Sequence, residues 1–277
     1  MLKDKILPRS IGFEGPDFVN KTRFSLITLE MLRRNGQEAI YVPLPFLKNT
    51  ITGRIFSHTR EIARESVPML FMTNRLEILP VLEKWVDASP KNWVVNDRTK
   101  MVGPVYAWAT IGWDIQWYTS TEALYPDSQV GILFKKPLSE SRRIMLKRAQ
   151  SGDDFKKAFD ADMALQAKVR EGFDLITSGR PNWSSINVSG FAKTEEAFRR
   201  WEIEKALKVW RHIIKRVGRP DWEAHAKEHI TQIRDGMPDD VEPIRKAEML
   251  PVRKELFRNL YRNRGGREKV LSTLFSA

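Results

Sequence analysis

The sequence predicts a three-layer α/β fold in which a parallel sheet of about five strands is flanked by helices. A strand, a tight loop, a helix and a second strand follow one another near the start of the chain. A later buried strand ends in charged residues, as parallel strands do where they face a ligand crevice. Of the 277 residues 42% are hydrophobic, enough to fill the core of one or two domains.

The amino-acid composition excludes several classes of protein and of functional site. The sequence has no cysteine, which excludes disulfides, thiolate nucleophiles and cysteine metal sites. It has no apolar run of about 18 residues and no signal-peptide pattern, so we expect a soluble, cytoplasmic protein that makes no use of a membrane. The formal net charge of +12 indicates polyanionic partners, and nucleotides and nucleic acid both qualify.

The first strand and its loop have the layout of a phosphate-binding loop, whose usual pattern is G-x-x-x-x-G-K-[ST]. Gly15 opens the loop, Lys21 and Thr22 begin a helix, and Asn20 replaces the second glycine. Asparagine tolerates positive φ better than most residues, so the loop can still turn. Backbone N–H groups would meet an anion, Lys21 would reach its outer phosphates, and Thr22 would offer a hydroxyl to Mg²⁺. A plain strand-to-helix turn with a solvated lysine is the other interpretation.

The next elements supply the context that such a loop needs. Apolar residues recur at helical spacing from Lys21 to Arg34, and Gly36 is placed to end that helix. Residues 39–42 then form a second buried strand, which the prolines of 43–45 end. The order strand, loop, helix, strand is the one in which phosphate-binding loops occur.

Residues 51–79 are predicted to be largely helical, with a second half that starts near 65–68. Within it Phe71 and Arg75 lie four residues apart, which places an aromatic ring and a guanidinium on one helix face. A core phenylalanine beside an arginine that extends to solvent has the same spacing.

Residues 91–98 have the composition of a buried strand that ends in charge. In a parallel sheet such residues point into the ligand crevice, where Asp97 could hold Mg²⁺ through water and Arg98 could bind a phosphate through two nitrogens. A surface ion pair is the alternative.

Several segments together resemble the thymidylate kinases, a family of P-loop nucleoside monophosphate kinases. The family pattern F-E-G-x-D-x-x-x-K-[ST] matches residues 13–22, L-F-x-x-N-R matches 70–75, and V-V-x-D-R-Y matches 94–99. The similarity covers residues 9–216 in order and also includes Gly103, Tyr106 and the segments 125–134, 139–148, 159–160, 169–173 and 186–189.

The resemblance implies a P-loop NTPase fold and ATP-dependent phosphorylation of a deoxynucleoside monophosphate, dTMP or a 5-substituted dUMP, to its diphosphate. Such a kinase takes part in nucleotide biosynthesis, uses Mg²⁺ and works by positioning and charge stabilisation. Related enzymes pair through helices, so we also expect a homodimer.

The resemblance also implies roles for individual residues. The catalytic set is Asp17, Lys21, Arg98, Arg143 and Arg148. The set that holds ATP and Mg²⁺ is Gly15, Asn20, Lys21, Thr22, Asp97 and Arg142, with Thr22 and Asp97 at the metal. The set that holds the acceptor nucleotide is Pro45, Phe71, Arg75, Arg98, Gly103 and Tyr106.

The sequence departs from the family at several of these motifs. The family carries Gly or Arg where Phe18 stands, and Tyr where Thr99 stands. Without an arginine in the loop, the cation for the transition state must come from the lid, and losing it costs orders of magnitude in rate. The lid candidates are Lys147, Arg148, Lys156 and Lys157. A weakened or retargeted kinase is therefore also considered.

The resemblance ends before the last part of the chain. We expect residues 1–218 to form the thymidylate-kinase-like domain and residues 219–277 to form a helical, basic C-terminal extension, broken at 236–238, at Pro251 and at 265–266. The role of this extension does not follow from the sequence.

A second function class is a DNA-binding or DNA-base-modifying protein, such as a kinase that acts on a base within DNA. Its motivation is the net charge, the basic tail and the aromatic residues between 106 and 118, which either pack in a core or dimer interface or stack on unpaired bases. Salt-dependent DNA binding would support it.

Overall fold

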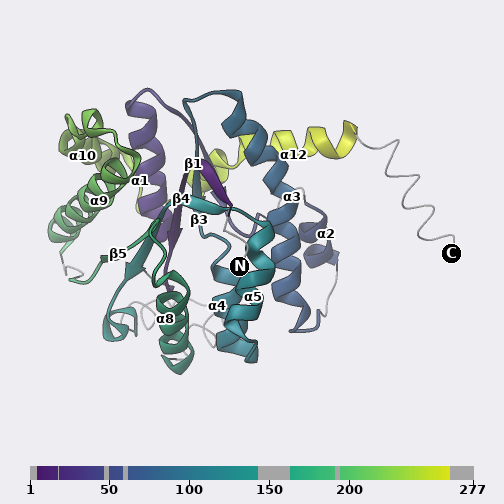
Figure 1. Ribbon diagram of the computed structural model, residues 1–277. Coiled ribbons are helices and arrows are strands. Elements are labelled where there is room, and N and C mark those ends of the chain that lie inside the picture. The colour runs from purple at the N-terminus through teal and green to yellow at the C-terminus, as the bar shows by residue number, and fades with distance from the viewer. Residues whose placement is uncertain are drawn as a thin grey trace, which may run out of the picture.

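The computed structural model describes residues 5–17, 19–46, 50–58, 62–142, 163–190 and 194–262. These residues form a parallel five-stranded sheet in the order β2-β3-β1-β4-β5, with helices on both faces (Figure 1). The strands are β1 (Ile6–Glu14), β2 (Glu38–Pro43), β3 (Asn92–Asp97), β4 (Asp127–Lys135) and β5 (Trp183–Asn187). The predicted three-layer fold is confirmed.

Two helical layers enclose the sheet. One layer contains α1 (Lys21–Arg34) and α9 (Glu195–Val217). The other contains α3 (Ser66–Ala88), α4 (Val102–Ile111), α5 (Ile115–Thr121) and α8 (Met163–Thr177), with α2 (Ile51–His58) packed against α3. No described helix has the length and apolar character to cross a membrane.

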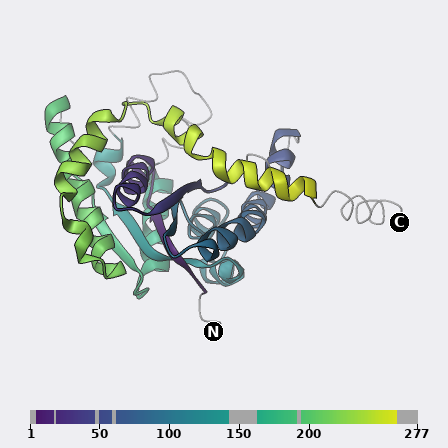
Figure 2. The ribbon, with the colours of Figure 1, turned by 90° about the horizontal axis from the view of Figure 1, so that it is seen from above.

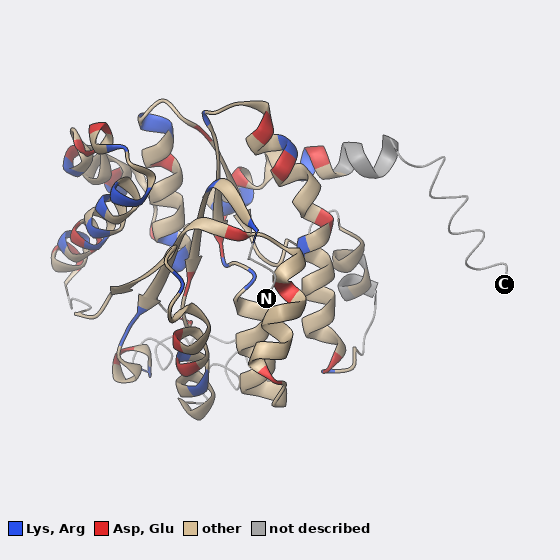
Figure 3. Cartoon of the chain, viewed as in Figure 1, with Lys and Arg blue, Asp and Glu red and all other residues tan. Residues whose placement is uncertain are grey.

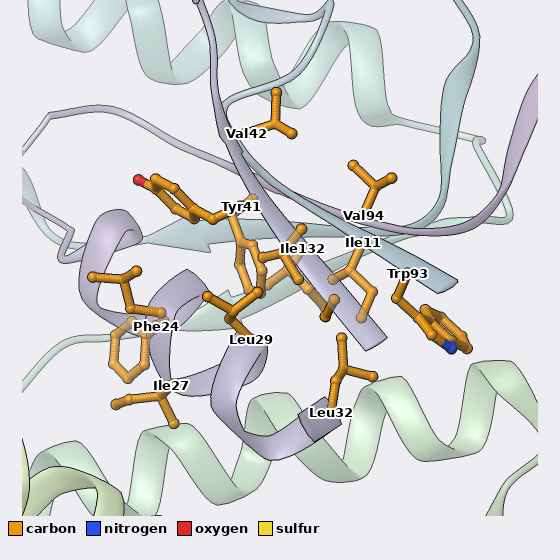
Figure 4. Close-up of a cluster of buried hydrophobic side chains, with 14 of the residues drawn as sticks. Ile11, Phe24, Ile27, Leu29, Leu32, Tyr41, Val42, Trp93, Val94 and Ile132 are labelled. Carbon is orange, nitrogen blue, oxygen red and sulfur yellow. The ribbon is translucent and has the colours of Figure 1, made fainter. Parts of the chain in front are cut away.

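Helix α1 forms as the sequence predicts. Its apolar side chains, among them Phe24, Ile27 and Leu32, pack with residues of the sheet such as Ile11 (Figure 4). Asn20 precedes the helix with φ of 61°, in the left-handed region that asparagine tolerates. At the other end Gly36 has φ of +72°, which ends the helix where the sequence predicts.

The structure corrects the bounds of two elements. The second half of the segment predicted as helical over 51–79 starts at Ser66, as predicted, but this helix, α3, continues to Ala88. It continues because Pro80 lies on the exposed side while Val81 and Val86 carry on the buried face. The late strand, expected at 186–189, lies at 183–187.

The C-terminal extension packs on the α1 and α9 side of the domain and reaches α3. Its described part, up to Arg262, contains η2 (Pro220–Glu223), α10 (Ala226–Gly236), α11 (Glu242–Glu248) and α12 (Leu250–Arg262). Helix α10 packs against α1 and α9, and α12 lies beside α3 (Figure 2). Its buried residues Trp222, Ile230 and Val252 belong to the same hydrophobic cluster as the sheet. The extension therefore contributes to the core of the domain. The predicted breaks at 236–238 and Pro251 coincide with helix junctions, and 265–266 lie outside the described residues.

A buried ion triad joins the extension to the domain. Glu202 of α9 is fully buried between Arg23 of α1 and Arg234 of α10. The Nε atom of Arg23 lies 2.5 Å from one carboxylate oxygen, and Arg234 pairs with the other. Burial raises the pKa of Glu202, while the two arginines oppose this effect. Removing the carboxylate would leave two buried guanidinium groups without their partner.

We expect Glu202→Gln to lower the free energy of unfolding by about 3 kcal/mol or more, because a buried charge left unpaired is costly. Urea denaturation followed by circular dichroism measures this. The matched control is Glu204→Gln on the same helix, whose side chain is 76% exposed. It should change the free energy by less than about 0.5 kcal/mol. Equal stability of the two variants would contradict a structural role of the triad.

Candidate functional site

The register of the sheet brings three strand ends to one place. Phe13 of β1 and Pro43 of β2 both lie opposite Asp97 of β3, so the residues that follow these strands share one edge of the sheet. An open cavity of about 840 Å³ lies at this edge, and Lys21 and Thr22 line it together with Asp97. The sequence predicted a ligand crevice at these strand ends, and the cavity is in that place.

The loop after β1 is shaped by a glycine. Gly15 has φ of +140°, and a Cβ atom there would come within 2.6 Å of the carbonyl oxygen of Phe134. The ammonium of Lys21 folds back over the loop and donates to the carbonyl oxygens of Gly15 at 2.9 Å and Pro16 at 2.6 Å. Burial lowers the pKa of Lys21 to about 8, Arg98 adds to that effect and Asp17 opposes it. The lysine is therefore mostly charged at neutral pH and held at the centre of the loop.

Thr22 and Asp97, which the resemblance assigns to Mg²⁺, meet at the mouth of the loop. The Thr22 hydroxyl donates to Oδ2 of Asp97 at 2.6 Å, and the hydroxyl of Tyr41 donates to the same oxygen at 2.6 Å. Burial raises the pKa of Tyr41, and the charge of Asp97 adds to this effect, so the tyrosine is a proton donor. A hydroxyl and a carboxylate are hard oxygen ligands that suit Mg²⁺, which takes its other ligands from water and phosphate. The described residues contain no group of three side chains that would hold a metal alone.

Asp17, Arg98 and Tyr106 form a second connected group. Arg98 donates to Oδ1 of Asp17 at 2.6 Å, and Tyr106 donates to Oδ2 at 2.9 Å. Burial alone would raise the pKa of Asp17, but Arg98, Lys21 and the Tyr106 hydrogen bond outweigh it and lower the pKa to about 2. Arg98 adopts φ of 78°, a value that side-chain-bearing residues seldom take, and its N–H is held by the carbonyl of Phe13 at 3.0 Å. The local backbone is thus constrained where the arginine faces the cavity.

Glu14 is a buried acid to which the sequence analysis assigned no role. Its Oε1 accepts hydrogen bonds from the backbone N–H and the hydroxyl of Thr99, the latter at 3.0 Å. Its Oε2 has no hydrogen-bond partner among the described residues. Burial raises the pKa of Glu14 to about 7, against the opposing charges of Arg98 and Lys21. Threonine at position 99, one of the departures from the family pattern, therefore supplies a donor to this acid.

Arg75, predicted to contact an acceptor base, is fully buried in an ion pair that the sequence analysis missed. Its Nε lies 3.1 Å from Oε2 of Glu122, and a second guanidinium nitrogen pairs with Oε1. A Cβ at Gly103 would lie 2.8 Å from that nitrogen, so the glycine lets α4 approach the pair. Phe71 is half-buried one turn before Arg75. The role of Arg75 and Phe71 toward a base stays a prediction.

Some of the remaining predicted site residues lie in the described part of the chain, and the others lie outside it. Pro45 follows β2 and is partly buried, and Arg142 is exposed at the end of the helical residues 138–142. The other lid and loop candidates lie outside the described residues, namely Phe18, Arg143, Lys147, Arg148, Lys156 and Lys157.

The aromatic cluster between 106 and 118 is only partly buried. Trp113 packs edge-on against Trp117 and Tyr118, with ring centroids 5.6 and 5.4 Å apart. Tyr118 is buried, whereas Trp117 is 50% exposed. The rings thus pack on one another while Trp117 keeps half of its surface exposed.

Comparison with known proteins supports the fold. No family model matches the sequence, and no curated protein does either. Among solved structures, the chain is similar to thymidylate kinase from Candida albicans, with 19% sequence identity and a TM-score of 0.56. The match covers 76% of this chain and 92% of that one. The chain thus has a thymidylate-kinase-like fold.

The raised pKa of Glu14 predicts how stability changes with pH. Between 4.5 and about 7 the folded protein holds a proton at Glu14 that the unfolded chain has lost, so the free energy of unfolding falls as pH rises through this window. We expect Glu14→Gln to be more stable than the unmodified protein at about pH 8, and to lose this advantage at about pH 5. Urea denaturation at both pH values measures it.

The control for this experiment is Glu171→Gln, because Glu171 is exposed on α8. It should show the same pH dependence as the unmodified protein. If Glu14→Gln also keeps that pH dependence, Glu14 does not titrate in this window.

Proposed function

We propose that the protein is a nucleoside monophosphate kinase that transfers a phosphoryl group from ATP to a deoxynucleoside monophosphate, dTMP or a 5-substituted dUMP. One observation carries the proposal: Lys21, Thr22, Asp97 and Arg98 surround a single cavity at the carboxyl edge of a parallel sheet. Phosphoryl transfer needs cationic and metal-binding groups in that arrangement more than it needs a nucleophilic side chain.

The donor side is assigned to the loop after β1 and the start of α1. The loop N–H groups and the α1 N-terminus bind phosphate oxygens, and Lys21 exchanges its backbone carbonyl partners for the outer phosphates. Thr22 and Asp97 would hold Mg²⁺, which when bound neutralises the charge of the ATP phosphates. Asn20 shapes the loop through its left-handed backbone.

The acceptor side is assigned to the group around Arg98. Arg98 can bind the acceptor phosphate through two nitrogens, while Asp17 holds its guanidinium and Tyr106 holds Asp17. The base would lie toward Phe71 and Arg75, where Glu122 now occupies the guanidinium. Binding of the acceptor therefore either rearranges the Arg75–Glu122 ion pair or recognises the base through other residues.

The charge distribution bears on the nucleic-acid alternative. Acidic and basic residues are mixed on α10 and on the first half of α9, whereas residues 205–217 of α9 carry basic charges alone, and α4 and α5 carry none (Figure 3). Several of these basic residues are already paired, such as Arg211 with Glu223 at 2.7 Å. Residues 205–217 of α9 are therefore the described segment on which phosphate-backbone binding would act, whereas the comparison with solved structures supports the kinase. The expected homodimer and cytoplasmic location stay predictions.

We expect ADP release from ATP to depend on an added deoxynucleoside monophosphate and on Mg²⁺. A coupled assay over dTMP, dUMP, dCMP, dGMP and dAMP identifies the acceptor. Lys21→Ala should lower the rate by about a hundredfold or more, because it removes a preorganised cation from the transferred phosphate.

Lys84→Ala is the matched control, because Lys84 is 65% exposed on α3 and pairs with Glu255 away from the cavity. Its rate should match that of the unmodified protein. No turnover with any of the five acceptors would reject the proposed function.

A further inference from the structure

The cavity over the phosphate-binding loop has a wall that the resemblance to kinases does not reach. Lys21, Thr22 and Asp97 line the cavity, and so do Arg234, Asp239 and Arg245 of the C-terminal extension. The extension begins after residue 218, beyond the segment that resembles the family. The site is therefore enclosed by two parts of the chain that lie far apart in sequence.

Polar contacts fix the extension beside the loop. Arg23, the residue after Thr22, donates to the carbonyl oxygens of Pro238 at 3.0 Å and Asp239 at 3.2 Å. At the far end of α1, Arg33 binds both carboxylate oxygens of Glu248 at 2.9 and 2.7 Å. Because both contacts come from α1, α11 is held at a defined position relative to the loop at the start of that helix.

Arg245 of α11 is the cation that this arrangement brings to the metal and phosphate end of the cavity. It hydrogen-bonds Tyr41, and its charge acts on Tyr41 and Asp97, the two residues that meet at the proposed Mg²⁺ site. Its Nε atom is buried and has no hydrogen-bond partner among the described residues. This donor is therefore available at the site, as are Nη1 of Arg98 and Nη2 of Arg23.

The other described cations that line the cavity are more firmly engaged. Arg98 pairs with Asp17, Arg23 and Arg234 share the buried Glu202, and Lys21 is held by backbone carbonyls. Arg245 instead pairs with Glu242 at 2.9 Å, three residues away on the same helix, and the Glu242 side chain is 43% exposed. Exposed pairs of this kind contribute little energy, so an incoming phosphate can replace Glu242 readily.

Several carboxylates line the same cavity and would repel the negative charge of a polyphosphate that carries no metal ion. Glu195, Asp239, Asp240 and Glu242 all line the cavity. Their charge favours a nucleotide that enters with Mg²⁺, which carries less net negative charge than the free nucleotide. A guanidinium among these acids can also bind two phosphate oxygens at once, which a lysine cannot.

We propose that the C-terminal extension completes the phosphate site and that Arg245 binds a phosphate of the nucleotide held over Lys21, taking it in exchange for Glu242. This inference rests on the proposed function, because it assigns a further binding residue to the same site. It also gives the loop, which carries no arginine at its described positions, a guanidinium from another part of the chain.

The test compares two neighbouring cations of α11. Arg245→Gln should weaken binding of Mg²⁺-ATP, measured by isothermal titration calorimetry on the full chain, by about tenfold to a hundredfold. Arg245→Lys should recover part of that loss. Lys246→Gln removes an equal charge from a side chain that is 72% exposed, and it should change the dissociation constant by less than about twofold.

A second variant makes the exchange itself testable. Glu242→Gln should strengthen Mg²⁺-ATP binding, because it frees Arg245 before the phosphate arrives. Kinetic constants then identify which phosphate Arg245 binds: a raised KM for ATP in Arg245→Gln assigns it to the donor, and a raised KM for the acceptor assigns it to the acceptor. The melting temperature of each variant checks that the fold is intact.

The outcomes separate this inference from the proposed function. If the unmodified protein binds Mg²⁺-ATP and Arg245→Gln binds it as well as Lys246→Gln does, the inference is wrong and the kinase proposal stands. If Arg245→Gln binds more tightly, the extension obstructs the site and the inference is also wrong. If the unmodified protein binds no Mg²⁺-ATP, the proposed function is wrong, and so is the role proposed for Arg245.

Discussion

The alignment of three strand ends around Asp97 is the constraint on which the site depends. Phe13 and Pro43 lie opposite Asp97 on its two sides, and this register places Thr22 and Tyr41 within hydrogen-bond distance of one carboxylate oxygen. A shift of β3 by a single residue would turn the Asp97 side chain to the opposite face of the sheet. The loop after β1 would then keep its shape but lose the carboxylate of the proposed Mg²⁺ site.

The buried charges around this point are held by neighbouring charges and by hydrogen bonds. Arg98 keeps Asp17 ionised, with its pKa lowered to about 2 even though burial opposes this. Lys21 keeps most of its charge at neutral pH with its pKa near 8, because neighbouring carboxylates oppose the effect of burial. Burial raises the pKa of Glu14 to about 7, so this buried acid carries less negative charge than an exposed glutamate at the same pH. A phosphate that displaces the backbone partners of Lys21 thus meets a cation whose desolvation is already complete.

The sequence was sufficient where a motif and its context decide the structure and insufficient where no pattern links the residues that meet. The φ of Asn20, the end of α1 at Gly36 and the meeting of Thr22 with Asp97 all follow from motifs and their strand–helix context. The partner of Arg75 could not be predicted, because no motif links this arginine to Glu122. The continuation of α3 past Pro80 depends on which side of the helix faces the core, a property of packing rather than of propensity.

The C-terminal extension is a part of the proposed site that the sequence did not predict. Its buried residues Trp222 and Val252 share the hydrophobic cluster of the sheet, so deleting it would uncover the core as well as open the cavity. Loss of activity in a truncated chain would therefore say little about Arg245. A charge on a half-exposed side chain can be removed with far less effect on the core. Helix α1 carries the phosphate-binding loop at its start and contacts the extension at both of its ends. The same helix therefore sets the position of the loop and of the extension residues that line the cavity.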